Sequence, residues 1–69
     1  MYRVGDRVQA NGTLSEVGFH GPGEHEHAAA GDTGRVLFVD TAGWPSVRFD
    51  RTGTATLCDP LVDIRPVVS

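Results

Sequence analysis

Apolar and polar residues alternate along short stretches of this chain, and such a period of two predicts β-strands that are buried on one face. The alternation is clear in VGDRVQA (4–10) and PSVRFD (45–50), whereas GRVLFVD (34–40) is apolar on both faces, as in a strand covered on two sides. No stretch has the spacing of an amphipathic helix, and nine glycines and four prolines interrupt every candidate. The pattern therefore predicts an all-β chain.

Turn residues divide the chain into five expected strands. DRTG (50–53) ends in a glycine that suits a tight hairpin, and DPLV (59–62) can form one turn of 3₁₀ helix before the last strand. This order predicts a small five-stranded SH3-like barrel with a long first loop, and a single domain over 1–69. The expected strands are 4–10, 34–40, 45–50, 54–58 and 63–67.

Such a barrel has room for one small core, because a chain of 69 residues buries only about 60% of the surface that its unfolded form exposes. The inward positions of the expected strands supply that core. Its predicted members are Val8, Val36, Phe38, Val47, Phe49, Leu57 and Ile64.

Residues 11–33 form a polar, glycine-rich segment that is too irregular for a long strand and is expected to be a loop, although TLSEVGF (13–19) could be extended. A loop of this length in a small domain usually carries function. It overlaps GFHGPGEHEHAAAGDTG (18–34), which has three histidines and no obvious core to pack against. A solvated segment and a partner-binding loop are both compatible with this composition.

The HEH motif adds a third alternative, a metal site. An extended backbone would place His25 and His27 on one side and Glu24 and Glu26 on the other. With His20 brought back across the intervening turn, three imidazoles could bind zinc or nickel and leave one coordination position open. A glycine-rich loop, however, loses much conformational entropy on forming such a site, and structural zinc sites usually have four ligands. The same five side chains are the candidate partner contacts of the loop.

Trp44 is a further candidate contact, because it lies in the AGWP turn (42–45). An indole in a turn can cover the open end of a barrel, or it can belong to an interface, since tryptophan is enriched at interface hot spots. A neighbouring arginine such as Arg48 would strengthen either role through a cation–π contact. Both roles remain open from the sequence.

No motif predicts catalysis. Cys58 is the only cysteine, so an intramolecular disulfide and a cysteine-only metal site are excluded, and no histidine lies close to it in the sequence. We expect it to be a small buried residue in a reducing compartment. The chain has no apolar run of the length that a signal peptide or a membrane span requires, which predicts a cytoplasmic protein without a membrane partner.

The formal charge of the chain narrows the class of partner that we expect. Nine carboxylates against six arginines and no lysine leave a formal charge of −3, and the arginines are dispersed along the sequence. Nucleic-acid binders usually gather positive charge on one face. The balance of charges therefore disfavours nucleic acid and favours a protein partner.

Four short motifs, GDRV (5–8), GDTGRV (31–36), VRF (47–49) and DIRPV (63–67), resemble the SH3-like barrels that accompany electron-transfer and metalloenzyme complexes. They are most similar to the NifZ family of nitrogen-fixation accessory proteins. The resemblance implies a non-catalytic domain that binds a metalloenzyme subunit during its assembly or in the mature complex. HEHAAA (25–30) replaces the basic and apolar residues that this family commonly has before its GDxGxV motif, so a contact made there would be chemically altered.

Together these features predict a non-catalytic accessory module for a larger metalloprotein, as in nitrogenase maturation, with the 11–33 loop and Trp44 as its contacts. A small metal-binding or metal-delivery protein that uses His20, His25 and His27 is the first alternative. A nucleic-acid-binding barrel is the second, and the acidic balance disfavours it.

Overall fold

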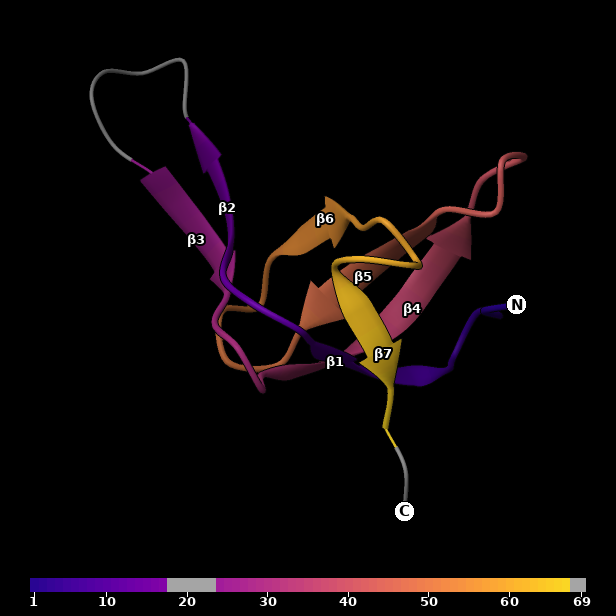
Figure 1. Ribbon diagram of the computed structural model, residues 1–69, viewed down its shortest axis with the longest axis horizontal. Coiled ribbons are helices and arrows are strands. Elements are labelled where there is room, and N and C mark those ends of the chain that lie inside the picture. The colour runs from indigo at the N-terminus through magenta and orange to yellow at the C-terminus, as the bar shows by residue number, and fades with distance from the viewer. Residues whose placement is uncertain (18–23, 68–69) are drawn as a thin grey trace.

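The computed structural model describes residues 1–17 and 24–67, which contain seven short strands (Figure 1). No helix occurs in these residues, and so none in them is long and apolar enough to cross a membrane. The predicted all-β class is confirmed. The strands are β1 (Arg7–Ala10), β2 (Leu14–Val17), β3 (Glu24–Ala28), β4 (Thr33–Val39), β5 (Pro45–Phe49), β6 (Ala55–Leu57) and β7 (Ile64–Pro66).

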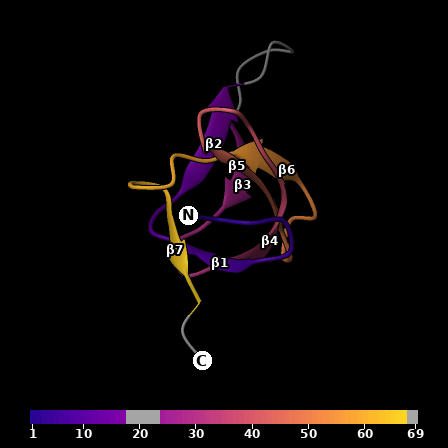
Figure 2. The ribbon, with the colours of Figure 1, turned by 90° about the vertical axis from the view of Figure 1, so that its right-hand side faces the viewer.

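Five of these strands form one antiparallel sheet in the order β6-β5-β4-β1-β7. The first strand of the chain lies in the interior of this sheet, between β4 and β7, and the last strand lies at its edge. Figure 2 shows the sheet curling from β6 and β5, through β4, to β1 and β7. Hydrogen bonds do not join β6 to β7 within the described residues, so pairing does not close the sheet into a barrel.

The first strand is shorter than its sequence predicts. It begins at Arg7 rather than at Val4, because the chain turns at Gly5. The φ of this glycine is 94°, and its N–H donates to the carbonyl of Val36 at 2.8 Å. Val4 is exposed as a result and contributes nothing to the core.

The prediction of a loop over 11–33 is wrong in part, because β2 and β3 pair with each other in a separate two-stranded sheet. Leu14 pairs with Ala28, and Glu16 pairs with His25. Neither strand has a long apolar alternation, so the hydrophobic pattern gives no signal for them. Backbone pairing needs no particular side chains, and it forms a hairpin that extends away from the larger sheet in Figure 1.

The core lies on the inner face of the five-stranded sheet. Most of its predicted members are confirmed, and Ala10, Ala28 and Cys58 join them. The predictions for Phe38 and Leu57 are wrong, since these residues are 59% and 52% exposed. The buried hydrophobic residues are Val8, Ala10, Ala28, Val36, Val47, Phe49, Cys58 and Ile64.

A bulge in β4 accounts for the exposure of Phe38. Val36 pairs with Val47 and Phe38 pairs with Ser46, so Leu37 is an extra residue between the two pairs. Because side chains alternate along a strand, one extra residue moves the following side chains to the opposite face. Phe38 therefore faces outward, and β4 is not buried on both faces as its sequence predicts.

The register of the edge strand β6 accounts for the exposure of Leu57. Thr56 pairs with Val47, which is buried, whereas Leu57 pairs with Ser46 on the other face. Directly paired residues of antiparallel strands share a face. Leu57 is therefore directed outward, although alternation along so short a strand is compatible with either face.

Candidate functional site

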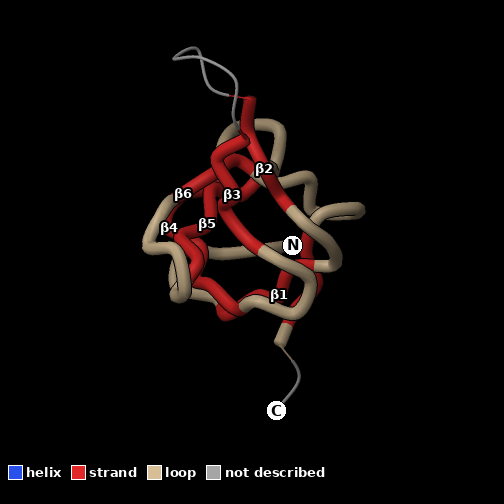
Figure 3. The backbone as a smooth tube through the Cα atoms, turned by 90° about the vertical axis from the view of Figure 1, so that its left-hand side faces the viewer, coloured by secondary structure: helices blue, strands red, loops and turns tan. Residues whose placement is uncertain are grey.

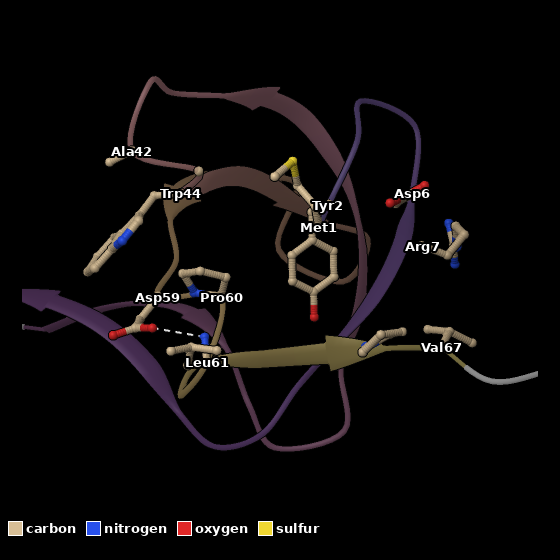
Figure 4. Close-up of a pocket in the computed structure, with 12 residues that line it drawn as sticks. Met1, Tyr2, Asp6, Arg7, Ala42, Trp44, Asp59, Pro60, Leu61 and Val67 are labelled. Carbon is tan, nitrogen blue, oxygen red and sulfur yellow. Dashed lines mark hydrogen bonds between the residues drawn. The ribbon is translucent and has the colours of Figure 1, made fainter.

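An open, largely apolar groove of about 910 Å³ lies where the N-terminal segment meets the turns at 40–44 and 59–63 and the end of β7. We call it the Trp44 groove. Figure 4 shows Pro60 between the rings of Trp44 and Tyr2. The groove is lined by Met1, Tyr2, Asp6, Arg7, Ala42, Gly43, Trp44, Asp59, Pro60, Leu61, Pro66 and Val67.

Trp44 is positioned by the turn between β4 and β5. Asp40 Oδ1 accepts hydrogen bonds from the N–H groups of Ala42 and Trp44, both at 2.9 Å. Gly43 has a φ of 86°, which other residues rarely adopt, and Pro45 starts β5. Aspartate, glycine and proline are typical turn residues, so the local sequence favours this conformation. The turn leaves the tryptophan 38% exposed.

Leu61 is presented by the second turn. Asp63 Oδ2 accepts a hydrogen bond from the N–H of Asp59 at 2.8 Å, and Asp59 Oδ1 accepts one from the N–H of Leu61 at 2.9 Å. The N–H groups of Val62 and Asp63 share the carbonyl of Asp59, so the segment is a hydrogen-bonded turn in place of the expected 3₁₀ helix. The turn holds Leu61 90% exposed to solvent.

The N-terminal segment forms the third wall. Asp6 Oδ2 accepts a hydrogen bond from the N–H of Arg3 at 2.9 Å, and the backbone of Gly5 is bonded to β4. This arrangement packs Tyr2, which is half-buried, against the core. Burial and the carboxylate of Asp6 raise the pKa of the Tyr2 hydroxyl above its ordinary value of 10.0. The tyrosine is therefore neutral at physiological pH.

Cys58 connects the two turns of the groove, since its N–H donates to the carbonyl of Pro45 at 2.9 Å. Its side chain is buried, as the sequence predicts. Burial, with a smaller effect of the Asp63 carboxylate, raises the pKa of the thiol to about 11. The thiol is protonated at neutral pH, which suits a packing role and not a nucleophile.

The polar groups of the groove are fixed at its margin. Asp6 and Asp59 are held by the backbone hydrogen bonds that they accept. The guanidinium of Arg7 lies 3.0 Å from Asp50, which offsets its charge. The groove therefore combines an apolar lining with two carboxylates, and this combination suits a ligand that has apolar and basic groups.

The HEH motif belongs to β3, whose extended backbone places neighbouring side chains on opposite faces. His27 is only 8% exposed, and its Nδ1 lies 2.9 Å from Thr54 Oγ1. Thr52 Oγ1 donates to the carbonyl of His27 at 2.7 Å, while the exposed Glu26 forms an ion pair with Arg51 at 3.4 Å. These contacts attach the β2-β3 hairpin to the turn between β5 and β6. Figure 3 shows the molecule from the side of this hairpin, with β3 in front of β5.

The side chains of the remaining loop candidates lie outside the described part of the chain. Glu24 and His25 are on β3, where their backbones pair with Val17 and Glu16, but their side chains are outside the description. His20 lies outside the described residues altogether. In residues 1–15 and 26–67, whose side chains the structure describes, no group of three or more histidine, cysteine, aspartate or glutamate residues could hold a metal ion. A zinc or nickel site that uses these histidines and His27 stays a prediction.

Arg48 does not line the Trp44 groove. It is exposed on β5 opposite Arg35 of β4, and Arg35 lies opposite Arg7 of β1. Arginines that are dispersed in the sequence are thus brought into one row across three strands. Alternation could have placed each of them on the outer face, but only the strand register places them side by side.

No protein-family model, curated protein or solved structure matches this chain. Its own groove, arginine row and anchored hairpin are therefore the features from which a function can be inferred. The groove combines a concave shape, exposed apolar side chains and fixed polar groups, which together characterise binding sites. Tyr2, Pro60 and Leu61 were not candidates in the sequence, because the segments that carry them meet only in the folded chain.

Proposed function

We propose that this chain is a non-catalytic interaction module that binds a segment of a protein partner in the Trp44 groove. The observation that carries this proposal is the apolar surface left exposed there, since Leu61 is 90% and Trp44 38% exposed on a chain of 69 residues. A contiguous exposed apolar surface marks interaction sites in soluble proteins. Tryptophan is also enriched among the residues that dominate binding energy.

The charges of the groove select the segment that it binds. Asp6 and Asp59 contribute carboxylates at its margin, whereas the charge of Arg7 is offset by Asp50. The chain as a whole has a formal charge of −3. A segment in which arginine or lysine flanks apolar side chains complements both the lining and this negative margin. We therefore assign the groove to an extended, apolar and basic segment of a partner protein.

The titratable groups of the groove support a binding role over a catalytic one. Asp6 and Asp59 accept backbone hydrogen bonds, and Arg7 is paired. The pKa of Tyr2 is raised further from neutrality by burial and by Asp6. A general acid or base works best with a pKa near the working pH, and the raised pKa of Tyr2 lies away from it.

The proposal extends to the fold and to the class of partner. An SH3-like barrel is supported by the strand order and by the turn at 59–63 before the last strand. It is also supported by the β2-β3 hairpin, which lies between β1 and β4 in the sequence. The motif resemblance to the NifZ family supplies the partner class, a subunit of a metalloprotein such as nitrogenase during maturation. A solution structure with a flat, open sheet would contradict the barrel.

Trp44 is the only tryptophan, so its fluorescence reports directly on occupation of the groove. We expect a peptide of about ten proline, leucine and arginine residues to shift the emission to shorter wavelength and to reduce acrylamide quenching, because a bound segment removes water from the indole. The same peptide with glutamate in place of arginine should bind about tenfold more weakly. An unchanged emission with the arginine peptide at roughly 1 mM would contradict the proposal, since that is the weakest affinity it allows.

Leu61→Ser and Val62→Ser are the matched variants for this titration. Both remove an exposed aliphatic side chain from the same turn, but of the two only Leu61 lines the groove. We expect Leu61→Ser to weaken binding of the arginine peptide about tenfold and Val62→Ser to leave its affinity within about twofold. Equal losses in the two variants would place the contact outside the groove.

Affinity capture from the source organism tests the partner class. The wild-type chain, Leu61→Ser and Val62→Ser serve as parallel baits, followed by mass spectrometry. We expect a metalloprotein subunit that is retained by the wild type and by Val62→Ser but not by Leu61→Ser. Groove-dependent capture of proteins that hold no metal would reject the metalloprotein class while leaving the groove as a docking site.

A further inference from the structure

A row of arginines crosses the outer face of the five-stranded sheet. Arg7 pairs with Arg35, and Arg35 pairs with Arg48, so three guanidinium groups lie on three neighbouring strands. Directly opposite residues of antiparallel strands have Cβ atoms about 4.5–5.5 Å apart. Three of the six arginines of an acidic chain are thus gathered on one face.

The charges of this row are only partly neutralised. Arg7 donates a hydrogen bond to Asp50 at 3.0 Å, and Asp50 also accepts one from Thr33. Among the side chains that the structure describes, in residues 1–15 and 26–67, no hydrogen bond or ion pair involves Arg35 or Arg48. Like charges directly opposite each other destabilise a sheet, so this pair repels in the free chain. An anionic partner would relieve the repulsion.

Apolar side chains lie beside these two arginines. Phe38 and Leu57 flank Ser46 on the same outer face, and Leu37 is the exposed extra residue of the β4 bulge. Arginine and aromatic residues are enriched at the centres of protein interfaces, where lysine and glutamate are depleted. We call this surface the arginine face; it consists of Arg35, Leu37, Phe38, Arg48 and Leu57.

We propose that the arginine face is a second docking site, which binds an acidic protein segment that carries apolar side chains. The carboxylates of such a segment would accept bidentate hydrogen bonds from Arg35 and Arg48, and its apolar side chains would cover Phe38 and Leu57. The Trp44 groove has the opposite charge preference. The chain therefore joins two partners, one basic and one acidic, through different surfaces.

The surface favours a protein over a nucleic acid. Proteins that bind single strands on a sheet stack bases on several aromatic rings along a basic groove. This face instead places Phe38 beside Leu37 and Leu57. Its two arginines, which have no partner among the described side chains, lie on a chain of formal charge −3. A short acidic segment interacts with these two arginines locally, while the more distant carboxylates are screened by salt.

Amide chemical shifts of the isotope-labelled full chain test this assignment. The probes are a peptide of alternating glutamate and leucine, the same peptide with lysine in place of glutamate, and oligouridylate. We expect the glutamate peptide to shift the amides of 35–38, 46–48 and 55–57, with an affinity that falls as salt is raised. No shift with this peptide, equal binding of the lysine peptide, tighter binding of oligouridylate or shifts confined to the Trp44 groove would each overturn the proposal.

The double variant Arg35→Gln/Arg48→Gln separates binding from folding. Both side chains are exposed, so their loss should leave the chain folded, and an unfolding curve for each variant verifies this. Arg3→Gln is the matched control, since it removes an exposed arginine outside this face. We expect the glutamate peptide to bind the double variant at least about tenfold more weakly and the control within about twofold. A folded double variant with wild-type affinity would refute the second docking site.

Discussion

Phe49 is fully buried in the core, whereas Phe38 is 59% exposed on the outer face of the same sheet. Both residues sit in apolar, strand-like stretches, and the sequence pattern predicts both as core residues. The difference arises from Leu37, whose insertion in β4 moves Phe38 to the other face. At this position a single bulge, and not the type of residue, sets how much surface is buried.

Alanine substitutions at the two phenylalanines should have different effects. We expect Phe49→Ala to lower the free energy of unfolding by about 3–5 kcal/mol, because it leaves a cavity in a small core. Phe38→Ala should lower it by less than about 1 kcal/mol, since most of the ring is already in water. Urea unfolding followed by Trp44 fluorescence measures both. Similar losses of unfolding free energy in the two variants would contradict the bulge in β4 that turns Phe38 outward.

The buried thiol of Cys58 leads to a prediction of how the stability of the chain depends on pH. Burial raises its pKa from 9.0 to about 11 in the folded chain. Between these two values the unfolded chain has released the thiol proton and the folded chain has kept it, so rising pH favours unfolding. We expect stability to fall through this window and to fall less in Cys58→Ala, measured by urea unfolding. Tyr2→Phe is needed as a parallel variant, because the raised pKa of Tyr2 acts in the same direction.

At the scale of elements, β4 and β5 approach each other closely at Gly34. A Cβ atom at this position would lie 2.6 Å from the carbonyl oxygen of Arg48 and 2.8 Å from Val47 Cγ1. Neither neighbour is the end of a flexible side chain, so the two strands would have to separate. The absence of a side chain is therefore a packing requirement of this strand pair.

Gly34→Ala should destabilise the chain by about 1–3 kcal/mol through this overlap. Gly12→Ala is the matched control, because a Cβ there meets nothing within 4 Å, and we expect it to change stability by less than about 0.5 kcal/mol. Urea unfolding gives both values from the shift in midpoint, provided that the free energy of unfolding falls with urea concentration at the same slope in each variant. If Gly34→Ala were neutral, the close approach of β4 and β5 at this point would be wrong.

The β2-β3 hairpin is an element that the pattern of apolar residues does not reveal. The GDTG turn that follows it contributes to its anchoring. Asp32 Oδ2 accepts hydrogen bonds from the N–H of Ala29 at 2.9 Å and from Arg51 Nε at 2.7 Å, and these bonds hold the pKa of Asp32 below its ordinary value. Gly31 has a φ of 88° at the same turn. The motif that contributes to the family resemblance thus has a structural role of its own.

At the scale of the whole molecule, the formal charge of −3 conceals two surfaces of opposite preference. Carboxylates border the Trp44 groove, whereas guanidinium groups line the arginine face. A net charge describes the long-range field of a protein, while a short segment of a partner responds to the groups within about one Debye length of 8–10 Å. The acidic balance of the sequence therefore does not determine which partners bind each surface.

The sequence by itself determined that the chain is all-β, roughly where five of its strands lie and which residues make most of its turns, although the turn at Gly5 falls inside a predicted strand. These features depend on local alternation and on the conformational preferences of glycine, proline and aspartate. It also determined most of the core, including Val36, Val47 and Phe49. Phe38 and Leu57 were misplaced because their burial depends on a bulge and on the register of an edge strand.

The tertiary structure alone decided the groove, the arginine row and the pairing of β2 with β3. Trp44 could be recognised as a candidate contact, but its neighbours Tyr2 and Leu61 come from segments that meet only in the folded chain. Likewise, Arg35 and Arg48 become neighbours through strand register. Contacts between residues distant in sequence are set by packing and by backbone hydrogen bonding across the whole chain. They therefore cannot be predicted from a local pattern of side chains.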